Sequence, residues 1–151
     1  MADFDSISRQ EFLQIADCTV FNLRKATRAA SQLFVDALRG TGIRGGQFSI
    51  LAMTLRHQPV SVKELAENMV MDRTTLTRNL RPLERDGLIQ IATGKDRRVR
   101  EVSLTEEGKA ALAAAFPHWR EAQTKVIEGL GEGPFRELLD SLRSTVKAVE
   151  E

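Results

Sequence analysis

The sequence predicts a mainly α-helical fold with one small β wing. Apolar residues recur at helical spacing over long stretches that glycine or proline separates from one another. Only the segments 88–93 and 99–104 have the character of short strands. With 151 residues, the chain is long enough to bury a real core, either as one domain or as two small lobes that share it.

The first predicted helix is also the longest. It spans residues 8–38, where apolar residues recur every three or four positions without an intervening glycine or proline. Four glycines in the segment 40–46 then end it. A second, short helix carries Phe48 and is expected to stop before Pro59, because a proline disfavours the helical conformation of the residue that precedes it.

Two short helices joined by a tight turn follow. Ser61 and Glu64 have the spacing of a capping box, which predicts a helix start immediately after the serine. Asp72 is expected to cap a second helix that begins at Arg73 and buries a stripe of leucines. The Asp-Gly pair at 86–87 is expected to end this helix.

A hairpin and two more helices complete the chain. The strands 88–93 and 99–104 flank an arginine-rich loop. Thr105 is expected to start a helix that runs towards Leu130. The Gly- and Pro-containing segment 131–134 should separate this helix from a last one with a continuous apolar side.

The distribution of charge points to an anionic partner. The net charge is only +1, but residues 73–100 hold eight basic and three acidic groups, whereas residues 101–151 hold six basic and ten acidic groups. A nearly neutral protein with one concentrated basic segment favours a local anionic ligand, and nucleic acid is the commonest. On charge alone, a solvated charged face remains an equal alternative.

The helix pair followed by a hairpin is the arrangement of a winged helix-turn-helix, in which the second helix enters the DNA major groove. Such a recognition helix presents short polar and long cationic side chains opposite its core stripe. Threonines can contact thymine methyls or donate to phosphates, and arginine can bind guanine through two hydrogen bonds. The outward-facing set predicted here is Arg73, Thr74, Thr75, Thr77, Arg78 and Arg81.

The hairpin loop has the composition of a DNA-binding wing. Crowding cations onto a short turn disfavours the free protein, and the repulsion is relieved when DNA phosphates replace counterions. An arginine held out on a hairpin can enter the minor groove, where the potential is most negative. Asp96 stands two residues before Arg98 and can orient its guanidinium through paired hydrogen bonds. The predicted wing residues are Lys95, Asp96, Arg97, Arg98 and Arg100.

The order of these motifs resembles the MarR family of bacterial transcriptional regulators. The chain runs through a helix, "DGLI" at 86–89, a strand, "DRR" at 96–98, a second strand and "LTEEG" at 104–108. The resemblance covers nearly the whole chain. It implies a sequence-specific DNA-binding regulator, most often a repressor, that acts as a homodimer on a pseudo-palindromic operator and is released by a small-molecule effector.

The resemblance also implies a division of the chain. Residues 45–104 would form the winged DNA-binding lobe, and residues 1–44 and 105–151 would supply the helices for dimerisation. The broad apolar stripes on the first and last helices favour a dimer independently, because a subunit of this size has little else to cover them. Packing of these stripes within one subunit is the alternative.

Family members that bind aromatic carboxylates imply an effector pocket between the dimerisation helices and the winged lobe. The matching residues are Lys25 and Arg28, which are neighbours on one face of the first helix, together with Phe48 and Trp119. The alternative makes the two aromatic residues part of the core and the two cations part of a solvated face.

A redox switch at Cys18 is another alternative, because some family members sense peroxide with a cysteine near this place. The chain has no tyrosine to hold a thiolate, and Asp17 beside the cysteine disfavours one, so an interface or core role competes with it. His57 and His118 are 61 residues apart and show no metal-ligand spacing. We predict neither a metal nor a cofactor.

Several classes of protein are disfavoured. No apolar run approaches the roughly 18 residues that a membrane span needs, and the acidic N-terminus lacks the apolar core of a signal peptide. With its single cysteine, the chain is expected to be cytoplasmic. No motif of a catalytic site or phosphate-binding loop is present, so we predict that it is not an enzyme. A winged-helix module that binds an acidic protein instead of DNA is the remaining rival.

Overall fold

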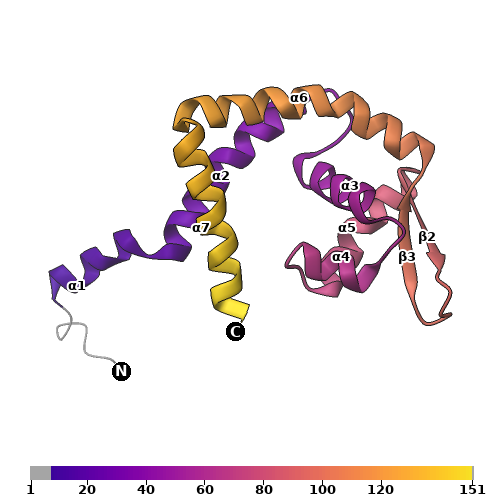
Figure 1. Cartoon of the computed structure of the whole chain (residues 1–151), viewed down its shortest axis with the longest axis horizontal. Helices are drawn as coiled ribbons and strands as arrows, with labels where there is room; N and C mark the ends of the chain where they lie inside the picture. Colours follow the sequence, from indigo (N-terminus) through magenta and orange to yellow (C-terminus); the bar gives the residue numbers. More distant parts are fainter. Residues whose placement is uncertain (1–7, 151) are drawn as a thin grey trace.

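The computed structural model describes residues 8–150. The prediction that the N-terminus is not a signal peptide concerns residues that lie mostly outside this range. The elements are α1 (Arg9–Leu13), the 3-10 helix η2 (Gln14–Asp17), α2 (Thr19–Ala37), α3 (Gly45–His57), β1 (Val60–Ser61), α4 (Val62–Asn68), α5 (Arg73–Arg85), β2 (Ile89–Thr93), β3 (Arg100–Leu104), α6 (Glu106–Leu130) and α7 (Glu132–Glu150). A compact lobe contains α3, α4, α5 and the sheet, and the long helix α6 leads away from it to α7, with α2 packed against α6 (Figure 1).

The prediction of one uninterrupted helix over residues 8–38 is wrong. The chain forms α1 and η2, becomes extended at Cys18 (φ −63°, ψ 121°), and only then enters α2. The side-chain amide of Asn22 donates hydrogen bonds to the carbonyl oxygens of Ala16, at 2.7 Å, and of Cys18, at 3.0 Å. Such local bonds offer the backbone an alternative to the helix, so the break needs neither glycine nor proline.

The helix pair of the lobe begins where the sequence predicts. The Glu64 amide donates to the Ser61 hydroxyl oxygen and the Ser61 amide donates to the Glu64 carboxylate, each at 3.1 Å, so the predicted capping box is confirmed. At the start of α5, the Thr75 amide donates to the Asp72 carboxylate at 2.8 Å, which confirms the second cap.

The end of α5 is fixed by Gly87, whose φ of +73° is the left-handed conformation that glycine adopts at low cost. The Gly87 amide donates to the Glu84 carbonyl oxygen at 3.0 Å, and the Leu88 amide donates to the Leu83 carbonyl oxygen at 2.9 Å. This pair of bonds is a Schellman motif. It turns the chain directly from α5 into β2.

The hairpin is confirmed as the larger part of a three-stranded antiparallel sheet in the order β1-β3-β2. Its strands begin one residue later than predicted. Strand β1 is additional: Val60 pairs with Val102, and the strand is only two residues long, too short to leave a pattern in the sequence. It ties the entry of α4 to the hairpin and so fixes where α4 lies relative to the wing.

The core lies beneath α5. Leu76, Leu80 and Leu83 of this helix are at most 1% exposed, and the leucine stripe packs with residues of α3, α4 and β3. Because this stripe occupies the inner side of α5, the polar side of the helix faces solvent.

The start of α6 is fastened to the end of α5, and its predicted cap is confirmed. The Thr105 hydroxyl accepts from the Gly108 amide at 2.9 Å and donates to the Gly87 carbonyl oxygen at 2.6 Å. A Cβ atom at Gly108 would lie 1.8 Å from the Leu88 carbonyl oxygen, so only glycine fits here. The "LTEEG" motif therefore holds the helical arm against the winged lobe.

The segment that separates α6 from α7 is shorter than predicted. Gly131 alone, with φ +85°, separates α6 from α7, which already begins at Glu132. Pro134 lies in the first turn of α7, where the missing amide proton removes no intrahelical hydrogen bond. The predicted linker 131–134 is therefore mostly helix.

Candidate nucleic-acid interface

The predicted outward face of α5 is exposed throughout. A shallow hollow of about 320 Å³ follows it, lined by Arg73, Thr74, Thr77, Arg78 and Arg81. Arginines and threonines therefore share one surface that is free for contact with a ligand.

Two threonine hydroxyls on α5 are already engaged within the helix. The Thr75 hydroxyl donates to the Asp72 carboxylate at 2.6 Å, and the Thr77 hydroxyl donates to the Arg73 carbonyl oxygen at 2.7 Å. The hydrogen bond from the Thr75 side chain, followed by that from its amide, lowers the pKa of Asp72 below its usual value. Thr75 does not line the hollow, so it serves the cap, whereas Thr77 lines it.

A second groove, of about 270 Å³, runs between α5, the start of α4 and the base of the wing. Four cationic residues line it, and no acidic side chain does so among the residues that the structure describes. If α5 occupies a major groove and the wing the neighbouring minor groove, the sugar-phosphate strand that divides the two must pass here. We call this the strand groove; it is lined by Ser61, Val62, Lys63, Arg73, Thr77, Arg98, Val99 and Arg100.

Lys63 is the one cation of this groove that the sequence did not suggest as a site residue. It is a single lysine on a short helix and forms only a loose, exposed ion pair with Glu67, at 3.7 Å. Exposed ion pairs of this kind contribute little to the stability of the fold. Its position two residues after the capping serine was the only available signal, and its meaning depends on β1, which brings the start of α4 beside the wing.

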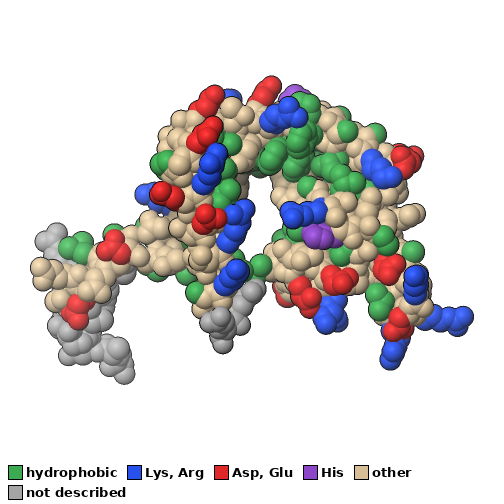
Figure 2. All heavy atoms as spheres, viewed as in Figure 1, with side chains coloured by type: hydrophobic (Ala, Val, Ile, Leu, Met, Phe, Trp, Pro, Cys, Tyr) green, Lys and Arg blue, Asp and Glu red, His purple; other side chains and the backbone are tan. Residues whose placement is uncertain are grey.

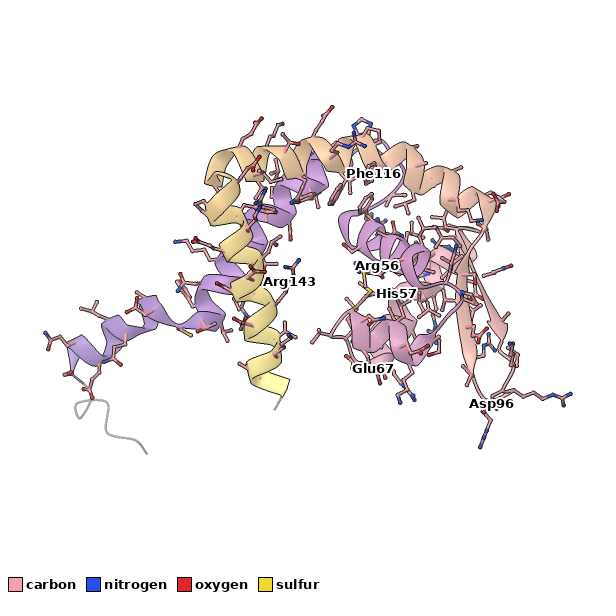
Figure 3. The ribbon with its side chains drawn as sticks, in the orientation of Figure 1. Arg56, His57, Glu67, Asp96, Phe116 and Arg143 are labelled. Carbon is pink, nitrogen blue, oxygen red and sulfur yellow. The ribbon has the colours of Figure 1, made fainter. Side chains whose placement is uncertain are left out.

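The wing projects from the lobe, and its tip carries Asp96 (Figure 3), with Lys and Arg side chains reaching into solvent (Figure 2). The expected pairing with Arg98 is present: Nε lies 3.3 Å from Asp96 Oδ1, and a terminal guanidinium nitrogen lies 3.2 Å from Oδ2. The Arg98 amide donates to Oδ1 at 3.0 Å; this bond and then the guanidinium lower the pKa of Asp96. The Arg98 side chain is 90% exposed, so it is oriented without being covered. Lys95, Arg97 and Arg100 are exposed as well.

Of the four residues predicted to form an effector pocket, the structure brings together two. Phe48 and Trp119 stack at a centroid distance of 5.6 Å and line a hollow between α2, α3 and α6. Lys25 and Arg28 do not line it. Arg28 follows Thr27, which does line the hollow, and successive residues of a helix point about 100° apart. Arg28 instead lines a shallow groove with Val20 and Arg24, and Thr27 borders both this groove and the hollow.

Cys18 is exposed at the N-terminal end of α2, and the sequence contains no second cysteine. Within residues 8–150, no group of three or more His, Cys, Asp or Glu side chains is arranged to hold a metal ion. In the same part of the chain, no helix combines the length and apolar character that crossing a membrane requires.

Together, the exposed cationic face of α5, the strand groove and the wing define a winged helix-turn-helix DNA-binding lobe. The model of the MarR family matches residues 45–99, which contain most of this lobe. The structure is similar to that of the M. tuberculosis transcriptional regulator MosR in complex with DNA, at 36% identity and a TM-score of 0.77, covering 89% of this chain and 99% of that one. The chain belongs to the MarR family.

Curated relatives agree with this assignment. An uncharacterized HTH-type transcriptional regulator of Bacillus cereus is 28% identical over 124 residues, which are 82% of this chain and 83% of the relative. The HTH-type transcriptional repressor MdtR of Bacillus subtilis is 26% identical over 117 residues, which are 77% and 74% of the two chains. The predicted family, fold class and role as a transcriptional regulator are confirmed, and the relatives are regulators, not enzymes.

Proposed function

We propose that this chain is a homodimeric repressor that binds a pseudo-palindromic DNA operator and is released by a small-molecule effector. The observation that carries the proposal is the strand groove, in which four cations line the space between the recognition helix and the wing. The similarity to MosR, whose structure contains DNA, and to the repressor MdtR supports the same function.

The cationic residues divide three tasks among them in this proposal. Arg78 and Arg81 on α5 contact base edges in the major groove, where a good bidentate contact discriminates between bases by ~1–3 kcal/mol. Lys63, Arg73 and Arg100 bind phosphates of the strand in the groove. Arg98, oriented by Asp96, enters the minor groove.

The helices outside the lobe support a dimer. No residue of α2 or α7 is buried among those described, although both helices carry large apolar side chains. Val20, Phe21 and Val35 of α2 are 55%, 46% and 48% exposed, and Leu138 and Val149 of α7 are 42% and 78% exposed. A second copy that covers these faces removes them from water, and its two-fold axis would place the recognition helices ~34–36 Å apart. We therefore assign dimerisation to residues 1–44 and 105–151.

The position of the hollow that Phe48 and Trp119 line, here called the aromatic hollow, supports release by an effector. Its lining comes from α2 and α6, which belong to the proposed dimerisation region, and from α3, which belongs to the lobe. A ligand that binds better when the two lobes are spaced wrongly for successive major grooves shifts the population away from DNA. The equilibrium between the two states cannot shift by more than the ratio of the ligand's affinities for them.

Selection of bound sequences from a random DNA duplex pool tests the proposal. We expect enrichment of a palindrome whose half-sites are one helical turn apart, because the dimer presents two recognition helices. As a control, a variant with Arg78→Ala and Arg81→Ala should fold normally but lose the sequence preference. Failure of the wild-type protein to enrich any sequence, together with salt-sensitive binding to an acidic protein, would contradict the proposal and favour a protein-interaction module.

A further inference from the structure

Three of the four methionines in the chain pack against the core of the winged lobe. Met53 of α3, Met69 and Met71 are each partly buried there, so their side chains contact the core and can still be reached from solvent. Figure 3 shows sulfur atoms, drawn in yellow, on the side of the lobe where α3 and α4 lie together. A thioether in this position is accessible to an oxidant and has apolar contacts to lose.

Met69 and Met71 frame the turn between α4 and α5, which sets the recognition helix in place (Figure 1). The Met71 amide donates to the Ala66 carbonyl oxygen at 2.9 Å, and the Val70 amide donates to the Glu67 carbonyl oxygen at 3.0 Å. These two bonds form a Schellman motif with Met69 as the C-cap. Met71 occupies the position whose apolar contact with the preceding helix frequently accompanies the motif.

The conformation of this turn is strained. Val70 has a φ of +51°, in the left-handed region that a β-branched side chain rarely adopts. Because Val70 is 61% exposed, burial of its own side chain offsets little of this strain. The turn therefore depends on the apolar contacts of Met69 and Met71 beside it. Asp72, which caps α5, follows Met71 directly, so a change in the turn reaches the start of the recognition helix.

We propose that Met69 and Met71 form an oxidation site that controls DNA binding: conversion of their thioethers to sulfoxides opens the turn and releases the recognition helix from DNA. The sulfoxide oxygen is a hydrogen-bond acceptor that an apolar core does not satisfy, so an oxidised side chain leaves the core. Release from DNA rests on the function proposed above, whereas oxidation of the two sulfurs does not.

Hypochlorous acid is the oxidant in this step, which transfers one oxygen atom. A bond forms between the methionine sulfur and the oxygen while the bond between oxygen and chlorine breaks. The sulfur loses two electrons, and the chlorine gains them and leaves as chloride. The hydroxyl proton of the acid passes to solvent. Methionine sulfoxide reductases reverse the modification, one enzyme for each sulfoxide epimer.

A modification-interference experiment tests the proposal without changing either methionine. The parent protein is Cys18→Ser, because a thiol competes for the oxidant and Cys18 is the only cysteine of the chain. The purified full chain is treated with less than one equivalent of hypochlorous acid, mixed with the selected operator duplex, and separated into DNA-bound and free protein.

Trypsin separates the site from an internal control. The peptide 64–73 contains both Met69 and Met71, and the peptide 45–56 contains Met53, so mass spectrometry counts sulfoxides at the two places independently. Met53 packs on the same core from α3, which does not form the turn. We expect the free protein to be enriched ~10-fold or more in sulfoxide at peptide 64–73, with no comparable enrichment at peptide 45–56.

Leucine substitutions give a matched test, because leucine keeps the volume of methionine and lacks the sulfur. After a full equivalent of oxidant per methionine, the operator affinity of the parent should fall ~10-fold or more and should recover when both reductases are added. In the same Cys18→Ser background, Met69→Leu with Met71→Leu should keep its affinity. The Met53→Leu control should lose affinity as the parent does.

Sulfoxide at peptide 64–73 that is as frequent in DNA-bound as in free protein would overturn the proposal. An equal loss of affinity in the double variant would overturn it too, as would a peptide 64–73 that stays unoxidised while peptide 45–56 reacts. If the untreated protein binds no DNA, the proposed function fails instead. Thermal unfolding then decides on the site: oxidation should lower the melting temperature of the parent but not that of the double variant, and equal lowering in both would refute the site.

Discussion

Replacing Lys63 by glutamine tests the strand groove at the residue that only the structure places there. Lys63 is one of the four cations of the groove, and a dimer presents each of them twice. The logarithm of the binding constant falls with the logarithm of salt concentration by ~0.9 for each phosphate contact. Loss of two contacts should therefore reduce the magnitude of the slope by ~1.8. Between 50 and 200 mM salt, the wild-type protein should lose roughly 12-fold more affinity than Lys63→Gln.

The assay is fluorescence anisotropy of a labelled operator duplex at several salt concentrations. Lys109→Gln is the matched control, because Lys109 lies on α6, pairs with Glu106 at 2.6 Å and does not line the groove. An unchanged slope in a folded Lys63→Gln protein would show that Lys63 does not contact a phosphate. A decrease of ~0.9 would mean that a single copy of Lys63 contacts DNA, which contradicts the symmetric dimer.

Three further substitutions make separate predictions. Arg98→Ala should weaken operator binding at least ~10-fold with unchanged thermal stability, because the guanidinium is 90% exposed and its proposed role is to enter the minor groove; unchanged affinity in anisotropy would contradict this. Val70→Gly should raise the free energy of unfolding by ~1 kcal/mol in urea titrations at fixed protein concentration, because Val70 is 61% exposed and has an unfavourable φ of +51°. Lower stability would refute the inferred strain. Gly108→Ala should destabilise by ~3 kcal/mol or more, because its Cβ would collide with the Leu88 carbonyl oxygen, and a change below ~1 kcal/mol would show that α6 shifts freely.

The features that could be predicted from the sequence are those that neighbouring residues determine. Asp72 caps α5 through the amide three residues ahead, and Gly87 ends the same helix through bonds to the preceding turn. Asp96 pairs with Arg98 for the same reason. Each involves groups that the covalent chain already holds close together, so spacing and residue type are sufficient evidence.

Features that depend on tertiary placement could not be predicted in this way. Lys63 belongs to the strand groove only because β1 pairs with β3 and brings α4 beside the wing. Arg28 lies outside the aromatic hollow because α2 turns Thr27 towards it, and no local pattern fixes that rotation. The break at Cys18 is an intermediate case, since one side chain, that of Asn22, competes locally with a helix that the apolar spacing favoured.

In the proposed complex, the DNA strand between the major and minor grooves lies against Lys63 in each subunit. Because Cys18 is the only cysteine, a Cys18→Ser, Lys63→Cys protein can carry a single tethered iron-EDTA group, with Cys18→Ser, Lys109→Cys as the control. On the selected operator, we expect two backbone cuts related by the dyad and about one helical turn apart, and none from the control. Absence of cuts from a protein that still binds the operator, or uniform cleavage along it, would show that the DNA strand does not lie against Lys63.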